Sequence, residues 1–520
     1  MPTIRIDNQD VPFTPGETVL TVARRRGAEI PTLCDVPDKD PLTSCMVCLV
    51  EVVGREGFVP SCAAVCEEGM EVRTETPAVL EARKAALEML LAEHLGDCVA
   101  PCTSACPAGA DIPRMLRRIG EGKVHEAVEV VKADLPLPAV LGRVCPAPCE
   151  RACRRAAADG AVAIARLHGY VAEADMRSDH HFVPKPAAET GKSVAIVGTG
   201  PAGLSAAWFL RLGGHACTVF ERRDQAGGML RYAIEPQRLP REVLQAEIDC
   251  MANMGVEFRC GVDVGRDITL DQLREKYDAV LLATGRLSHT ERPFGMDVYD
   301  GKLPVASDSM QTAIKGVFAA GDAVNPRRMA VRSVAGGKSA ADAIGRMLAG
   351  GKPKVAPRRW SCHMGRPDDE ELRIFLADAS DAGRMSDDMT PDTIADLDAR
   401  AEARRCLRCD CRKQSSCKLR SWAERYGASP TRLRRERRDY ERVEHPEVIY
   451  EPSKCIRCGV CIREAAEARE PLGLTFEGRG FDMRLAVPFG EPLSEGLRRA
   501  ARRCAQACPT GALSLRHGED

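Results

Sequence analysis

The sequence contains 24 cysteines, and most of them stand in closely spaced groups of the CxxC type. Cysteines at such spacings bind metal ions or iron–sulfur clusters through their thiolates. In a small secreted chain the cysteines would instead form disulfides. The N-terminal segment alternates like a strand and lacks the apolar core of an export signal. We therefore expect metal ligation in the cytoplasm, and both zinc and iron–sulfur clusters are open at this point.

The first group of cysteines lies in residues 1–78, a β-rich segment with many Val and Gly residues. A tight CxxC pair with two outlying cysteines on loops of a small β domain suits a [2Fe–2S] centre, and a zinc site is the alternative. Cys66 is expected to be a spare thiol. The four predicted ligands are Cys34, Cys45, Cys48 and Cys62.

The second group lies in residues 79–190, which begin with an apolar pattern of helical spacing and continue with Pro-marked turns. Its cysteines fall into two runs that only a compact helical domain would bring together. Clusters bound there would cross-link the two runs of cysteines. The candidate ligands are Cys98, Cys102, Cys106, Cys145, Cys149 and Cys153.

A glycine-rich motif follows in KSVAIVGTGPAGLSAAWFLRLGGHACTVFE, which predicts a strand, a turn, a helix and a second strand. Gly198 suits the tight turn, Gly200 lets the backbone approach a pyrophosphate, and Gly203 allows close packing of helix on strand. Glu221 ends the second strand, where a carboxylate binds a ribose hydroxyl. The motif predicts a Rossmann-like dinucleotide-binding domain.

Two further groups of cysteines lie near the C-terminus. The run RCLRCDCRKQSSC suits one [4Fe–4S] cluster, with zinc as the competitor, and CIRCGVC with a distant CP is the bacterial ferredoxin signature. We expect one cluster, not two, in residues 441–520, with Cys504 left over. Cys217, Cys250, Cys260 and Cys362 lack partners in sequence. The predicted ligands are Cys406, Cys409, Cys411 and Cys417, then Cys455, Cys458, Cys461 and Cys508.

The order of these motifs resembles a mosaic of known families. PTLC with CMVC, LVEVVG and SCAAVCEEGMEVRTET resembles the [2Fe–2S] domain that opens the large iron–sulfur subunit of respiratory NADH dehydrogenase. HLGDCVAPCTSACPAGADIP, GRVCPAPCERAC and GGMLRYAIEPQRLP resemble the glutamate synthase small subunit and dihydropyrimidine dehydrogenase. LLATG and GVFAAGDAV resemble a second FAD signature, which implies that Gly321 and Asp322 lie at the flavin's ribityl–phosphate region.

The resemblance also implies a grouping of ligands. Two [4Fe–4S] clusters would take Cys98, Cys102 and Cys153, and Cys106, Cys145 and Cys149, with each cluster short of a fourth ligand. His94 and His168 fall where the families carry further ligands, and the alternative is that both are ordinary helix histidines. We predict His94 as an iron ligand.

One part of the resembling families has no counterpart here. Their NAD(P)H domain lies between the ATG and GVFAAGD motifs, where this chain has only residues 286–315. Because such a stretch is too short for a βαβ-based domain, we expect no NAD(P)H site.

The sequence thus predicts a multidomain protein of the α+β and α/β classes. We expect a β-grasp-like [2Fe–2S] domain over residues 1–78, a helical bis-[4Fe–4S] domain over 79–190, and a Rossmann-like FAD domain over 191–350. A linker with the four-cysteine segment (351–440) and a ferredoxin-like [4Fe–4S] domain (441–520) follow. With 74 basic and 75 acidic residues, the chain has no general attraction to nucleic acid, and we find no apolar run that would span a membrane.

The cofactors predict an oxidoreductase that contains FAD, one [2Fe–2S] and about four [4Fe–4S] clusters. We favour an electron-transfer subunit whose partners are an NADH-oxidising flavin subunit, a hydrogenase, a formate dehydrogenase or ferredoxin. Electron bifurcation at the FAD is an option that the sequence leaves open. The alternatives are a stand-alone flavin enzyme for a small substrate and a scaffold that holds zinc. No catalytic residue is identified.

Overall fold

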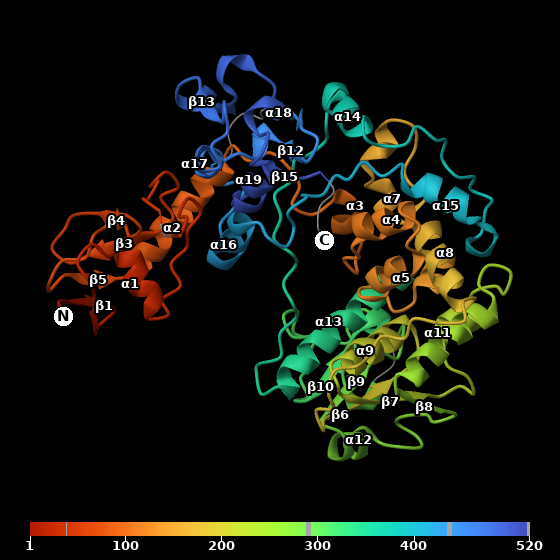
Figure 1. The fold of residues 1–520 in the computed structure, drawn as a ribbon. Coiled ribbons are helices and arrows are strands. Elements are labelled where there is room, and N and C mark those ends of the chain that lie inside the picture. Colours follow the sequence, from red (N-terminus) through yellow and green to blue (C-terminus); the bar gives the residue numbers. More distant parts are fainter. Residues whose placement is uncertain (38, 288–292, 434–438, 517–520) are drawn as a thin grey trace. The chain divides into compact units, whose positions relative to one another are not determined.

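The computed structural model describes all of residues 1–520 except 38, 288–292, 434–438 and 517–520 (Figure 1). The chain forms two compact units, and each is assembled from segments that are far apart in sequence. Helices and sheets are mixed in both units. The first unit comprises Met1–Val99, Arg359–Ala377 and Cys409–Asp520, and the second comprises Ala100–Arg358 and Asp378–Arg408.

The first unit opens with a mixed five-stranded sheet in the order β2-β1-β5-β3-β4, in which β1 and β5 are parallel (Figure 1). Helix α1 (Val19–Arg25) packs on it through Val19 and Val22, which are fully buried. The side chain of Thr18 caps the helix by accepting from the backbone N–H of Thr21. The strands are β1 (Thr3–Ile6), β2 (Gln9–Pro12), β3 (Leu49–Val52), β4 (Phe58–Pro60) and β5 (Glu71–Arg73).

Helix α2 (Pro77–Leu91) connects this sheet to the rest of the first unit, and it confirms the apolar helical pattern predicted there. Its Arg83 is buried and donates to the carbonyl of Leu49 in β3 and to the hydroxyl of Tyr426 in α16. These hydrogen bonds offset part of the cost of burying the guanidinium, whose Nη2 has no partner among the described residues, and they tie the three elements together. The remaining helices of this part are α14 (Asp369–Leu376) and α16 (Lys418–Tyr426).

The C-terminal part of the first unit has a three-stranded sheet in the order β11-β12-β15 and a two-stranded hairpin. Helices α17 and α19 pack against each other beside them. The elements are β11 (Val443–Glu444), β12 (Val448–Tyr450), α17 (Val460–Glu467), β13 (Thr475–Glu477), β14 (Arg484–Ala486), α18 (Leu493–Gly496), α19 (Ala501–Ala507) and β15 (Leu513–Leu515).

The second unit begins with a helical array that continues directly into a βαβ fold. Several of its short helices begin with a Pro residue, whose missing N–H is no loss at the first helical position. The helices are α3 (Pro101–Ala105), α4 (Ile112–Gly120), α5 (Val124–Lys132), α6 (Pro138–Val144), α7 (Pro148–Arg151) and α8 (Ile164–Met176), joined later by α15 (Asp396–Ala403).

The βαβ part of the second unit is a parallel sheet in the order β10-β9-β6-β7-β8 (Figure 1). Both faces are buried: Val194 and Ile196 of β6 join the core of α9 and α13, while Ala195 and Val197 join a second core that includes Leu273 of α12. Parallel strands with both faces covered are expected to be apolar throughout. The elements are β6 (Ser193–Val197), α9 (Pro201–Leu212), β7 (Ala216–Glu221), α10 (Gly228–Tyr232), α11 (Arg241–Asn253), β8 (Glu257–Cys260), α12 (Leu270–Lys276), β9 (Ala279–Leu282), β10 (Val317–Ala319) and α13 (Ala330–Leu348).

Between β9 and β10 the chain makes no second nucleotide-binding domain within the described residues, where the only helical or strand element is a 3₁₀ turn (Pro293–Gly295). No helix in the described ranges is both long and apolar enough to cross a bilayer. The absence of an NAD(P)H site, the cytoplasmic location and the bounds of the five predicted domains stay predictions.

Candidate iron–sulfur and flavin sites

The four cysteines predicted near the N-terminus lie in two pairs in the first unit. The sulfur atoms of Cys48 and Cys62 are 3.4 Å apart. A hydrogen bond from Cys45 lowers the pKa of the Cys34 thiol to about 5, so these two thiols are also in contact. All four are buried. Two pairs of thiols fit a [2Fe–2S] centre, in which each of the two irons takes two thiolates.

Cys66 lies in the hydrophobic core around α1, together with the predicted ligands Cys48 and Cys62. Burial raises the pKa of this thiol to about 11, which keeps it protonated at neutral pH. A thiolate binds iron, whereas a protonated buried thiol behaves as a small apolar group. The role of Cys66 as a spare thiol stays a prediction.

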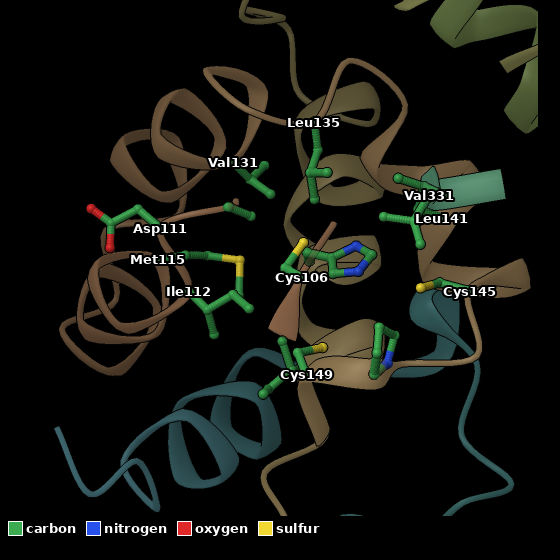
Figure 2. Close-up of a pocket in the computed structure, with 14 residues that line it drawn as sticks. Cys106, Asp111, Ile112, Met115, Val131, Leu135, Leu141, Cys145, Cys149 and Val331 are labelled. Carbon is green, nitrogen blue, oxygen red and sulfur yellow. The ribbon is translucent and has the colours of Figure 1, made fainter. Parts of the chain in front are cut away.

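In the second unit, Cys106, Cys145 and Cys149 line one pocket together with His168 (Figure 2). The three cysteines come from the end of α3, the end of α6 and the start of α7. The structure therefore brings together the three thiols that the sequence grouped for one [4Fe–4S] cluster.

His168 of α8 supplies a fourth possible ligand for this pocket. Its Nδ1 donates a hydrogen bond of 3.0 Å to the carbonyl oxygen of Pro138, which leaves Nε2 as the unprotonated nitrogen. Burial lowers the pKa of His168 to about 4, so the ring is neutral at physiological pH. A neutral imidazole with one nitrogen held by a carbonyl is the arrangement that metal-binding histidines use.

His94, the histidine predicted to bind iron, is in the first unit. Among the described residues its Nδ1 has no hydrogen-bond partner, and its charged neighbours are Lys454 and Glu451. Burial lowers the pKa of His94 to about 4. The buried, unpartnered nitrogen is compatible with a ligand, and iron binding by His94 stays a prediction.

Cys98 has a thiol neighbour that the expected grouping does not include, and the grouping of Cys98 with Cys102 and Cys153 stays a prediction. Cys98 belongs to the first unit, where its thiol is in hydrogen-bond contact with Cys362, whereas Cys102 and Cys153 belong to the second unit. The chain crosses from the first unit to the second just before α3. Cys102 and Cys153 pack against the core of the second unit, as does Cys406.

The run of four cysteines after α15 is divided in the same way. Cys406 belongs to the second unit, whereas Cys409, Cys411 and Cys417 belong to the first. Cys411 and Cys417 are buried, and Cys406 and Cys409 are half-buried. Across the described ranges, no three His, Cys, Asp or Glu side chains converge closely enough to hold a single metal ion.

The C-terminal ferredoxin signature forms a second pocket, lined by all four predicted ligands. Cys504, the predicted surplus cysteine, is fully buried and its sulfur donates to the carbonyl of Cys461. Gly459 has φ +81°, which lets the chain turn tightly between two of the ligands. The four ligands that line this pocket are Cys455, Cys458, Cys461 and Cys508.

The glycine-rich motif forms the predicted β6-turn-α9-β7 unit in the second unit. At Gly198, with φ +107°, a Cβ would collide with the carbonyl of Ala283, and at Gly203 it would collide with the carbonyl of Gly198. At Gly200 a Cβ would meet nothing within 4 Å. Packing therefore requires the outer two glycines, while the middle one faces open space where a pyrophosphate fits.

The two carboxylates predicted for the flavin lie near this turn. Glu221 ends β7 and accepts hydrogen bonds from the backbone N–H of Thr199, over 3.2 Å, and from the Thr199 hydroxyl. Asp322 follows Gly321 at the end of β10 and accepts from the hydroxyl of Ser333 over 3.3 Å. Burial raises the pKa of Asp322. These residues fit the edges of a dinucleotide site.

Cys362 is a residue that the sequence analysis missed as a candidate ligand. It stands alone in WSCHM, without a second cysteine within reach of a CxxC pattern. No local signal marks it, because its neighbours in space come from other segments of the chain.

Three family models match the chain in succession. Residues 1–77 match the 2Fe-2S iron-sulfur cluster binding domain, and residues 60–180 match dihydropyrimidine dehydrogenase domain II, 4Fe-4S cluster. Residues 172–339 match pyridine nucleotide-disulphide oxidoreductase. The matches follow the order of the [2Fe–2S] site, the helical pocket and the glycine-rich motif.

Several curated relatives share these regions. The NADPH-Fe(3+) oxidoreductase subunit beta of Geobacter sulfurreducens is 40% identical over 225 residues, which is 42% of this chain and 33% of that protein. The NADP(+)-dependent formate dehydrogenase subunit beta of Moorella thermoacetica is 40% identical over 207 residues, 36% of this chain and 29% of that one. The small chain of the NADPH glutamate synthase of Bacillus subtilis is 34% identical over 276 residues, 50% and 56% of the two chains. The chain thus spans between 29% and 56% of the length of these relatives.

Proposed function

We propose that this chain, which combines a 2Fe-2S domain, a 4Fe-4S domain of the dihydropyrimidine dehydrogenase type and a pyridine nucleotide-disulphide oxidoreductase domain, is an electron-transfer subunit of a larger oxidoreductase. Its relatives include the beta subunits of an NADPH-Fe(3+) oxidoreductase and of a formate dehydrogenase. FAD exchanges one or two electrons, and each iron–sulfur cluster exchanges one. The chain therefore has the cofactor sites that a link between partner subunits needs.

The observation that carries this proposal is the position of helix α13 in the second unit. Val331, in its first turn, lines the pocket of Cys106, Cys145 and Cys149. Ser333, two residues later, donates to Asp322 at the predicted flavin site. A single helical turn thus contacts both sites, so a cluster and a flavin bound there are neighbours.

Further contacts hold the helical array against the βαβ fold in the same unit. Lys338 of α13 pairs with Asp134, which follows α5, over 2.6 Å. Glu247 of α11 accepts from the backbone N–H groups of Ala139 and Val140 at the start of α6. These buried and half-buried contacts fix the distance between the pocket and α13, as electron transfer between two fixed sites requires.

The first unit supplies two more sites in one hydrophobic core. Cys34 and Cys45 of the paired N-terminal set lie in the same core as Cys458 of the C-terminal set. We propose that this unit accepts electrons from, or passes them to, a partner such as a formate dehydrogenase, a hydrogenase, an NADH-oxidising flavin subunit or ferredoxin.

The proposal is tested with the full chain, purified without oxygen. We expect FAD and iron in the same molecules, reduction of both by dithionite, and tight co-purification of partner subunits from the native source. Ser333→Ala should lower FAD occupancy without loss of iron, and Ser178→Ala, an exposed hydroxyl in the same unit, serves as control. Catalytic turnover of a small substrate by the chain alone, or a chain without iron, would overturn the proposal.

A further inference from the structure

Four buried cysteines of the first unit, from three segments of the chain, lie together outside the sites described so far. Cys98 is in contact with Cys362, and both Cys98 and Cys362 interact electrostatically with Cys417. Cys411 in turn interacts with Cys98 and Cys417. Exposed fractions of 6% and 3% for Cys98 and Cys362, and of 7% for Cys411 and Cys417, place all four inside the protein.

Reciprocal hydrogen bonds hold the segments of Cys98 and Cys362 side by side. The backbone N–H of Val99 donates to the hydroxyl of Ser361 over 3.2 Å, and the backbone N–H of Met364 donates to Asp97 over 3.1 Å. Each cysteine therefore lies next to a residue that binds the other segment. The hydrogen bonds between the two segments therefore hold the two thiols in contact, so that their contact does not depend on the side-chain rotamers alone.

The other two thiols are placed by α16 and by the segment after Cys508. Cys417 immediately precedes α16, and the backbone N–H of Arg420 points at its sulfur over 3.5 Å. The backbone N–H of Leu419 donates to the carbonyl of Pro509, and this hydrogen bond holds the start of α16 beside the C-terminal pocket. At Gly511 a Cβ would collide with the sulfur of Cys411, so only a glycine at this position leaves room for that thiol.

The surroundings of the four thiols also suit a group of net negative charge. Arg420 and Lys454 act on Cys98 as nearby cations, and Lys454 lies against Cys411 as well. Two carboxylates, Asp97 and Glu451, share the site, and Glu451 is already paired with Lys454 over 2.7 Å. N–H donors and cations around thiolates stabilise an iron–sulfur cluster and tune its potential.

We propose that Cys98, Cys362, Cys411 and Cys417 are the four ligands of one [4Fe–4S] cluster. The assignment rests on the proposed iron–sulfur function, and it replaces both the grouping of Cys98 with Cys102 and the assignment of the 406–417 run to a single cluster. The cluster would tie Arg359–Ala377 to the two ends of the first unit, because its ligands come from each of the three segments of that unit. Metal binding of this kind contributes directly to folding.

The first experiment compares Cys362→Ser with Cys66→Ser in the full chain, purified and measured without oxygen. Both residues are buried, and both lack a CxxC partner in sequence. We expect Cys362→Ser to lose about four iron atoms and one reduced-state EPR signal, with FAD retained. Cys66→Ser should keep the wild-type iron content. Retention of all iron by Cys362→Ser overturns the assignment, whereas a wild-type chain without iron overturns the proposed function instead.

A second measurement on the wild-type chain does not depend on a variant that folds. Iron is removed stepwise with a chelator, and the thiols that become open to alkylation are mapped by mass spectrometry. We expect Cys98, Cys362, Cys411 and Cys417 to become reactive together as iron is lost, while Cys217, a buried thiol without a cluster, stays protected. Stoichiometric zinc, a disulfide between Cys98 and Cys362, or reactivity of Cys362 independent of iron would each overturn the assignment.

Discussion

The hydroxyl of Ser44 donates a hydrogen bond of 2.9 Å to the carbonyl oxygen of Cys458. Ser44 precedes a predicted ligand of the N-terminal site, and Cys458 is a predicted ligand of the C-terminal site. Nearby, Lys39 pairs with Glu464 of α17 over 3.2 Å. The loops that carry the two ligand sets are thus packed against each other in the first unit.

This contact predicts a magnetic interaction between the two centres in the fully reduced protein. Cys458→Ser should remove the C-terminal cluster, and the [2Fe–2S] EPR signal should then relax more slowly because its paramagnetic neighbour is gone. Cys504→Ser is the matched control, since its sulfur only donates to a backbone carbonyl. Power saturation of the signal measures the effect, and identical saturation curves in all three proteins would contradict the proximity.

The second prediction is the iron content. The [2Fe–2S] centre and the three [4Fe–4S] clusters with ligand sets assigned above hold about 14 iron atoms, and the fourth predicted [4Fe–4S] cluster brings this to about 18, with an equal amount of acid-labile sulfide. Elemental analysis of protein prepared without oxygen should give that ratio, and exposure to air should lower it. Stoichiometric zinc with little iron would show that the thiols hold single metal ions.

The two histidines make a third prediction. His168→Ala should alter one EPR signal and shift its midpoint potential, because an imidazole in place of a thiolate raises the potential of an iron–sulfur centre. We predict a change in a different signal for His94→Ala, with flavin content intact in both variants. His125→Ala, a mostly exposed histidine on α5, serves as control. Unchanged spectra in a redox titration would leave either residue as an ordinary buried histidine.

A fourth prediction concerns Glu247, which accepts from the backbone N–H groups that begin α6. Burial raises the pKa of Glu247 to about 8, above the ordinary value of 4.5 for a glutamate. The folded state therefore binds this proton more tightly than the unfolded state, and the stability it contributes is full below pH 4.5 and is lost as the pH rises through 8.

Glu247→Gln should remove that dependence, because the amide carries no charge; its oxygen still accepts from one of the two backbone N–H groups, while its NH2 group faces the other. Relative to this variant, the wild-type free energy of unfolding should fall by as much as about 1.4 kcal/mol per pH unit between pH 5 and 8. Denaturant melts of the second-unit signals at several pH values measure the difference. A constant difference across this window would mean that Glu247 stays ionised.

The last prediction is that the isolated chain binds FAD but is not reduced directly by NADH or NADPH. Hydride transfer needs the nicotinamide held against the flavin ring, and orientation supplies much of its rate. In the described residues between β9 and β10 no domain is present that would hold a nicotinamide there. Stopped-flow mixing without oxygen should show no rapid bleaching of the flavin band until a partner subunit is added. Rapid bleaching by the chain alone would reveal a nucleotide site.

The sequence by itself determined those sites whose residues are close along the chain. The β6-turn-α9-β7 unit, the set of four cysteines near the N-terminus and the C-terminal pocket were predicted from local spacing, whereas the pairing of Cys34 with Cys45 and of Cys48 with Cys62 was not. Local spacing is informative there because a short peptide that carries a CxxC pair or a glycine turn can adopt only a few geometries. The single [4Fe–4S] set near the C-terminus needed just one distant residue, Cys508, and its CP context marked it.

Only the tertiary structure decided how the remaining cysteines are divided. The chain leaves the first unit after Val99, returns to it for Arg359–Ala377, and returns again at Cys409. Cys98 and Cys102, which are close in sequence, therefore belong to different units, and Cys98 is in contact with Cys362, which is distant in sequence. No periodicity or motif encodes this, because the contact depends on hydrogen bonds between distant segments, such as that from Val99 to Ser361.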